Sequence, residues 1–319
     1  MKMRKIVLAM FASTAIAGLS GCFSSSSSGS DLDTNTESGS VVDWYLQNAF
    51  VFADFNGNSQ YDADTDVAAE GLTDENGAFT LNVPASMGTD YVIVSQGGTD
   101  TATGATFNGI LKATPGATAV TPLTTLVQAT GDAAAVRSFL GLAEDADLSA
   151  DPATDKTLYA ASQALVYVIS SITSLIDYAT TETVDAATAE TTYSNLVTAA
   201  IADAIAAGST TFDVAFVTQT ITNVATDLGV SSEDADTLAN KSTQIVNQTS
   251  QIIDDINAVA TLDATSAQTV QTDVETSVEA VLETAPSITP VDVSDDSFIS
   301  NDEVEYLTGT GTDTGAETI

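Results

Sequence analysis

One short segment alternates oxygen-bearing side chains with other residues. Residues 54–66 read DFNGNSQYDADTD. Ca2+ binds six to eight oxygen atoms, and a twelve-residue calcium loop supplies them from positions 1, 3, 5, 7, 9 and 12, with a backbone carbonyl at position 7. Counted in this way, the candidate ligands are Asp54, Asn56, Asn58, the carbonyl of Gln60, Asp62, and Asp64 or Asp66 as the final acid. The segment predicts a calcium site, and the alternative is a solvated acidic turn.

The segment departs from that pattern at two positions. Position 6, where such loops have glycine for a sharp turn, is Ser59, and position 12 is Thr65. The bidentate acid would therefore have to come from one residue before or after position 12.

A second segment of this kind lies near the carboxyl end, after Pro286 and Pro290, and it resembles an EF-hand loop. The ligands that this resemblance implies are Asp292, Ser294, Asp296, the carbonyl of Phe298, Ser300 and Glu303. Ser297 stands at the glycine position, and the two prolines argue against a normal entering helix. The alternative is an acidic disordered tail.

The amino terminus carries the pattern of an export signal. Lys2, Arg4 and Lys5 precede an apolar run over 6–19, which is too short to span a bilayer comfortably. Residues 19–22 read LSGC and resemble the lipobox of bacterial lipoproteins, in which the cysteine becomes the acylated first residue. The resemblance implies diacylglycerol and an N-acyl chain on Cys22, and Phe23 in place of aspartate implies the outer membrane. The alternative is an ordinary secretory signal with an incidental cysteine.

The composition excludes several classes of function. The chain of 319 residues has 44 acidic and 7 basic residues, no histidine and one cysteine. Removal of Lys2, Arg4 and Lys5 with the signal would leave a net charge of −40. Such a polyanion cannot neutralise nucleic-acid phosphates. Without histidine there is no Ser-His-Asp triad and no imidazole metal site, and one cysteine forms no intrachain disulfide.

The order of segments predicts an α+β chain with two domains. We expect a signal peptide at 1–21, a flexible Ser-rich tether at 22–40, a small antiparallel β-sandwich at 41–120, an all-α helical bundle at 121–284, and an acidic tail at 285–319. The β-region shows period-two alternation, as in Phe79, Leu81 and Val83, and the turn 74–77 (DENG) precedes that strand. Short strands separated by such turns are typical of a sandwich.

Two runs in this region, VFADFNGNSQYDADTD and TDENGAFTLNV, resemble the Ig-like B domains of serine-aspartate-repeat adhesins and related carboxypeptidase-regulatory-like modules. A third run, from VIVSQGG to TPLTTLV, is similar to versions found in exported proteins of marine Gram-negative bacteria. The resemblance covers residues 41–127. It implies an extracytoplasmic, calcium-stabilised spacer or binding module and no catalyst.

After Thr121-Pro122 the period changes to that of helices. We expect a helix there, a short one after Asp132, and a long one from Asp151 to Ala179. Further helices are expected at 186–208, 214–228, 232–259 and around 270–281. Residues 159–176 contain no charge over 18 residues, so they predict either the buried central helix of the bundle or a membrane-inserted segment.

These features favour a membrane-anchored, surface-associated calcium-binding lipoprotein with a non-enzymatic binding, adhesion or matrix role. Its partners would be the membrane, through the lipid anchor, and a protein or surface glycan that the sequence does not identify. The first alternative is a carrier of lipid or hydrocarbon, with helix 159–176 lining an apolar groove. The second is a carboxylate-based hydrolase, which would need two acids close together in a cleft.

Overall fold

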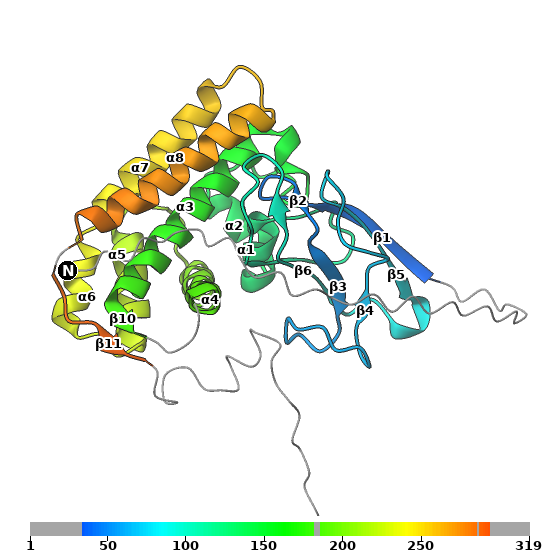
Figure 1. The fold of residues 1–319 in the computed structure, drawn as a ribbon, viewed down its shortest axis with the longest axis horizontal. Helices are drawn as coiled ribbons and strands as arrows, with labels where there is room; N and C mark the ends of the chain where they lie inside the picture. Colours follow the sequence, from blue (N-terminus) through cyan, green and yellow to red (C-terminus); the bar gives the residue numbers. More distant parts are fainter. Residues whose placement is uncertain (1–33, 182–185, 286, 294–319) are drawn as a thin grey trace, which may run out of the picture.

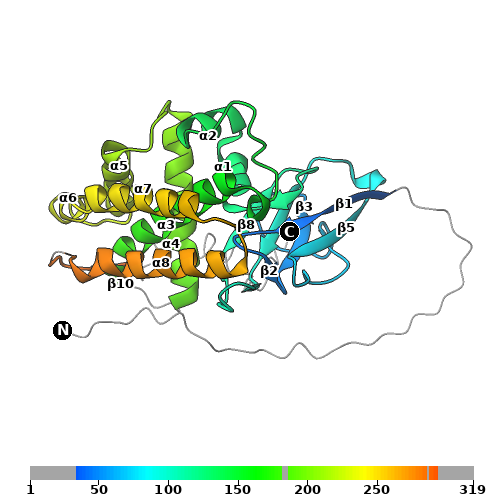
Figure 2. The ribbon, with the colours of Figure 1, turned by 90° about the horizontal axis from the view of Figure 1, so that it is seen from above.

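The computed structural model describes residues 34–181, 186–285 and 287–293, and within them the chain is a mixed α and β protein. Strands dominate up to Val120 and helices dominate from Pro122 onward. Figures 1 and 2 show the strands up to Val120 on one side of the molecule and the helices on the other, which agrees with the α+β organisation expected from the sequence.

Two small sheets form the β-part. The first has the order β5-β1-β9, with β1 (Thr34–Val41) antiparallel to β5 (Ala78–Pro84) and parallel to β9 (Ala119–Val120). The second has the order β4-β3-β6-β8 and is antiparallel throughout, and its strands are β4 (Val67–Ala68), β3 (Phe50–Asp54), β6 (Val92–Gln96) and β8 (Ile110–Ala113). The short strands β2 (Leu46–Gln47) and β7 (Thr99–Asp100) pair with each other, and a 3-10 turn, η1 (Ala85–Met87), follows β5.

The two sheets bury a common core. In β5, Phe79, Leu81 and Val83 are buried while the residues between them are more exposed, as the period-two pattern predicts. Their side chains belong to the same hydrophobic cluster as Val51 of β3 and Ile93 of β6. The β-part therefore has its own apolar centre.

Strand β1 lies within the segment that was expected to be a flexible tether. Thr34 to Ser40 pair with Pro84 to Ala78 of β5, so the ordered part begins earlier than predicted. Most side chains of β1 are exposed or half-buried. Because a strand can be held by backbone hydrogen bonds alone, such a sequence carries little hydrophobic signal.

The helical part contains eight α-helices in the described residues. They are α1 (Pro122–Thr130), α2 (Ala133–Phe139), α3 (Lys156–Ala179), α4 (Ala186–Ala206), α5 (Val214–Asp227), α6 (Ser232–Ala239), α7 (Ser242–Ala258) and α8 (Ala264–Glu283). A 3-10 turn, η2 (Pro152–Thr154), precedes α3. Near the end of the described chain, β11 (Val291–Asp292) pairs in parallel with β10 (Thr180–Thr181).

Side-chain caps explain where several helices begin. Thr121 caps α1 in a capping box with Thr124, and Pro122 occupies the first helical turn. Asp132 caps α2 by accepting from two backbone N–H groups. Asp151, predicted to open the long helix, caps η2 instead, and Asp155 caps α3.

The helix expected over 232–259 is two helices. The chain breaks between α6 and α7 at Asn240 and Lys241, although Leu238, Ile245 and Ile252 keep a spacing of seven. Two contacts accompany the break. The hydroxyl of Ser242 donates to the carbonyl of Ala239 at 2.6 Å, and the buried Lys241 ammonium donates to Thr284 just beyond α8. Lys241 and Thr284 are 43 residues apart, so the sequence around Lys241 does not indicate their contact.

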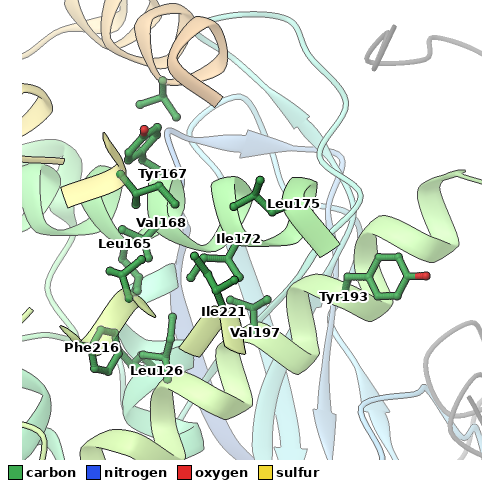
Figure 3. Close-up of a cluster of buried hydrophobic side chains, with 14 of the residues drawn as sticks. Leu126, Leu165, Tyr167, Val168, Ile172, Leu175, Tyr193, Val197, Phe216 and Ile221 are labelled. Atoms are coloured by element: carbon green, nitrogen blue, oxygen red, sulfur yellow. The ribbon is translucent and has the colours of Figure 1, made fainter. Parts of the chain in front are cut away.

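Helix α3 is the centre of the helical part, and it contacts α1, α4, α5, α7 and α8. Figure 3 shows Leu165, Val168 and Ile172 of α3 packed in a cluster of buried side chains with Leu126 of α1 and Ile221 of α5. Among the described residues, α3 is the one helix long and apolar enough to cross a membrane, and 83% of its most apolar window is buried inside the protein. These contacts confirm the prediction of a buried central helix.

Candidate functional site

The acidic loop, residues 54–66, connects β3 to β4 and begins with a buried carboxylate. Asp54 ends β3 and is 1% exposed. Its Oδ1 accepts from the backbone N–H of Gly57 at 2.7 Å and of Asn56 at 3.2 Å, and its Oδ2 accepts from Ser59 at 2.7 Å. Ser59 has a φ of 62°, the left-handed conformation that glycine adopts most easily. Ser59 therefore makes the sharp turn for which calcium loops have glycine at position 6.

Three of the other predicted ligands, Asn56, Asn58 and Asp62, contact one another. Asn56 Oδ1 accepts from the N–H of Asn58 at 3.0 Å, and Asn58 Oδ1 accepts from that of Gln60 at 2.8 Å. The amide Nδ2 groups of both asparagines donate to Asp62 Oδ2, at 2.7 Å from Asn56 and 2.9 Å from Asn58. The alternating residues thus point into the loop toward a shared carboxylate.

The loop is closed by Asp66 and tied to the sheet. Asp66, 6% exposed, accepts from the N–H of Phe55 at 3.0 Å and of Asp62 at 2.8 Å. Gln96 of β6 donates to the Ser59 carbonyl at 2.7 Å. Asp64 is exposed and takes no part in these bonds. Of the two candidates for the final acid, Asp66 is therefore the one that faces the loop.

The acidic loop, as the structure describes it, is not arranged as a finished metal site. Throughout 34–181, 186–285 and 287–293, no group of three or more His, Cys, Asp or Glu side chains is placed to hold a metal ion. Of the second set, Asp292 lies in β11, with its backbone opposite Thr181. The remaining residues of that set, Ser294, Asp296, Phe298, Ser300 and Glu303, lie outside the described residues, as does Cys22.

A second group of polar side chains, which sequence reasoning missed, lies where the β-part meets the helices. We call it the joint cluster: Asp43, Asp100, Tyr159, Gln163 and Gln271. Gln163 Nε2 donates to Asp43 Oδ1 at 3.0 Å and to its backbone carbonyl at 2.9 Å. Gln271 Nε2, from α8, donates to Asp100 Oδ2 at 2.9 Å. Helix α3 is thereby bonded to the segment between β1 and β2, and helix α8 is bonded to strand β7.

Asp100 is held by backbone donors as well. Its Oδ1 accepts from the N–H of Ala102 at 2.8 Å and of Thr103 at 2.9 Å, and its Oδ2 accepts from the N–H of Trp44 at 3.3 Å. Asp100 is 6% exposed, so this carboxyl group is largely removed from solvent and is held by protein donors.

The neighbouring carboxyl group, that of Asp43, has a raised pKa. Burial, together with repulsion from Asp100, raises the pKa of Asp43 to about 7, although the hydrogen bond from Gln163 acts in the opposite direction. Burial and the charges of both aspartates also raise the pKa of the Tyr159 hydroxyl above its usual range. The phenol is therefore neutral and lies within the electrostatic reach of both carboxyl groups.

The joint cluster bears on the hydrolase alternative, which needs two neighbouring acids in a cleft. Two acids do interact here, but the indole ring of Trp44 lies 5.7 Å from the ring of Tyr159, between centroids, and both rings are buried. Hydrogen bonds occupy both oxygens of Asp100, and buried aromatic rings pack beside the two acids.

An apolar pocket lies elsewhere, inside the helical part. It has a volume of about 60 Å³ and is lined by Ala161, Ala164, Leu165 and Val168 of α3 together with Phe139 and Phe216. These aromatic rings contact each other, with centroids 4.7 Å apart. The pocket adjoins the uncharged helix, as the carrier alternative requires, but it has room for only a few carbon atoms.

Comparisons of the chain with protein-family models, with curated proteins and with solved structures gave no match.

Proposed function

We propose that the chain is a membrane-anchored, surface-associated calcium-binding lipoprotein with a non-enzymatic role in binding, adhesion or matrix formation. In this proposal the β-part is an Ig-like sandwich whose acidic loop binds Ca2+, and the helical part is a bundle that presents a surface to a protein or glycan. The high negative charge argues against nucleic acid as the partner.

The observation that carries the proposal is the preformed turn of the acidic loop. Asn56 and Asn58 already contact Asp62, and Asp54 already accepts from the N–H of Ser59, which adopts the left-handed turn. Binding would require the two asparagine amides to rotate, so that their oxygens face the ion beside Asp62. The rotation exchanges the bonds that these oxygens now accept from the backbone N–H groups of Asn58 and Gln60 for bonds to Ca2+. Ca2+ would then replace two N–H donors as the neutralising partner of Asp62.

The membrane anchor in this proposal is Cys22. Helix α3 passes the length and hydropathy criteria for a span, but its apolar faces are used by its neighbours in the core. Attachment would then depend on the acyl chains, since each buried methylene contributes about 0.8 kcal/mol and several chains together give stable anchoring.

The anchor is tested by expressing the full chain in a Gram-negative host with labelled palmitate. We expect the label on the wild type and its loss in Cys22→Ser, with the variant recovered from the soluble periplasmic fraction. Equal membrane recovery and no label in either protein would contradict the lipid anchor.

The calcium site is tested by thermal unfolding of the full chain in calcium and in chelator. A ligand present at 100 times its Kd stabilises the native state by about 2.7 kcal/mol, so the midpoint should rise in calcium. Asp54→Asn should abolish most of this rise. The matched control is Asp90→Asn, which removes one charge from an exposed position of the β-part and should leave the rise unchanged. An equal rise in wild type and Asp54→Asn would contradict binding at this loop.

The apolar pocket beside α3 favours a second candidate, a carrier of small hydrocarbons. Solvent extraction of the purified chain followed by mass spectrometry tests it. Bound hydrocarbon in wild type, and its absence in a variant with the pocket filled by Ala164→Phe, would support the carrier. Extracts free of hydrocarbon would contradict it.

A further inference from the structure

We propose that the joint cluster is a separate cation site, which binds a divalent cation of the Ca2+ type between the β-part and the helices. Its protein ligands would be one carboxylate oxygen of Asp43, the amide oxygen of Gln271 and the hydroxyl of Tyr159, with water completing the shell. This site does not depend on the acidic loop or on the proposed function.

The first argument is the unbalanced charge. Asp43 and Asp100 interact with each other, and Glu275 of α8 interacts with Asp100 as well. The four basic side chains of the described residues make their contacts elsewhere. Lys112 lies near Asp54, Arg137 donates to Ala146, Lys156 to Val259, and Lys241 to Gln244 and Thr284. Buried carboxylates need a neutralising partner, and no side chain described here supplies one.

The second argument is independent of charge and concerns polar atoms without partners. Gln271 Oε1 and the Tyr159 hydroxyl are both fully shielded from solvent and have no hydrogen-bond partner. Gln271 is 8% exposed and Tyr159 is 0% exposed. Most buried polar atoms in proteins are paired, so two unpaired oxygens at one place indicate a missing ligand.

Both unpaired oxygens belong to side chains that surround the carboxylates. The amide group of Gln271 that carries the unpaired Oε1 also donates through Nε2 to Asp100 at 2.9 Å. Tyr159 is close enough to Asp43 and Asp100 for both to act on its hydroxyl. Neutral oxygens and carboxylates together form the ligand set that a hard divalent cation prefers.

The two aspartates would have different parts in the site. Both oxygens of Asp100 already accept hydrogen bonds, so Asp100 contributes its charge. Asp43 uses Oδ1 for Gln163, and its Oδ2 has no partner among the described residues. Asp43 as a residue is partly exposed.

The experiment uses terbium, which replaces Ca2+ at oxygen sites and emits light when a nearby indole transfers energy to it. Trp44 is the single tryptophan of the chain, and it lies beside the joint cluster. Its backbone N–H donates to Asp100, and its ring contacts that of Tyr159. The full chain is titrated with terbium while tryptophan alone is excited. We expect saturable emission that added Ca2+ displaces. No tryptophan-sensitised emission would overturn the proposal.

Three variants assign the signal. Asp43→Asn should weaken terbium binding by about tenfold or more, because it removes the charged ligand. Tyr159→Phe removes only an unpaired hydroxyl, so it should fold normally, and it should weaken binding several-fold. Asp54→Asn, in the acidic loop, should leave the tryptophan-sensitised titration unchanged. Unchanged affinity in both Asp43→Asn and Tyr159→Phe, or loss of the signal in Asp54→Asn, would overturn the proposal.

Discussion

The raised pKa of Asp43 predicts that the folded protein loses stability as the pH rises toward neutrality. The pKa of this carboxyl is about 7 in the fold and 3.8 without the fold. Between these values the native state holds a proton that the unfolded chain releases, so the free energy of unfolding falls as pH rises from about 4 to about 7 and levels off above that. The difference of about 3 pKa units corresponds to about 4 kcal/mol, as an upper limit for a partly exposed group.

The substitution that tests this is Asp43→Asn. Asparagine has the same shape and is neutral at every pH, and it keeps an oxygen that can accept from Gln163. The variant should match the wild type below about pH 3, where Asp43 is protonated in both the folded and the unfolded state, and should be more stable by up to about 4 kcal/mol near pH 8.

The assay is urea unfolding followed by the fluorescence of Trp44, in chelating buffer at a series of pH values. The quantity of interest is the difference in the free energy of unfolding between variant and wild type, because the other carboxyl groups cancel in it. Asp90→Asn, at an exposed position, is the control and should give a difference near zero throughout. A difference for Asp43→Asn that does not change between acidic and alkaline pH would refute the reasoning.

Three further predictions concern single contacts. Gly77→Ala should destabilise the protein by about 2–4 kcal/mol in urea unfolding, because Gly77 has a φ of 67° and a Cβ there would lie 2.4 Å from the Val41 carbonyl oxygen. Asp132→Ala should cost about 1 kcal/mol through loss of the α2 cap, whereas Asp132→Asn should cost less. The Tyr91 hydroxyl donates to Glu37, and burial and this carboxylate raise its pKa to about 12, so stability should fall between about pH 10 and 12. The pKa of Tyr45 is also raised to about 12, so an alkaline absorbance titration of Tyr91→Phe should show this late step reduced by one tyrosine.

Much of the fold was predictable because local signals agree with it. The cap at Thr121-Pro122 marks the start of α1, and the alternation of Phe79, Leu81 and Val83 marks β5. The uncharged run over 159–176 indicates a buried helix, and α3 is that helix. In each case the residues that form the sequence pattern are the same residues that cap the helix or pack in the core.

The errors in the fold arise where distant contacts decide the structure. Strand β1 is exposed on most of its side chains and is held by its pairing with β5. The break between α6 and α7 coincides with the contact of Lys241 with Thr284, which is 43 residues away. Neither contact leaves a periodic signal in the local sequence.

The two candidate sites also differ in whether local sequence or distant contacts define them. The acidic loop was found because its oxygen-bearing residues alternate within 13 positions, 54–66. The joint cluster was missed because Asp43, Asp100 and Gln271 come from three separate regions, and two aspartates among 44 acidic residues carry no signal. The unpaired oxygens that distinguish this cluster are visible only after folding.

The calcium-binding loop is the central claim, and a crystal structure of the full chain grown in calcium tests it most directly. The account predicts an anomalous scattering peak inside residues 54–66, within about 2.3–2.6 Å of side-chain oxygens from Asp54, Asn56, Asn58 and Asp62, as Ca2+ requires. The two asparagine amides would then present oxygen to the ion. A loop without such a peak, with Nδ2 of Asn56 and Asn58 still donating to Asp62, would contradict the account.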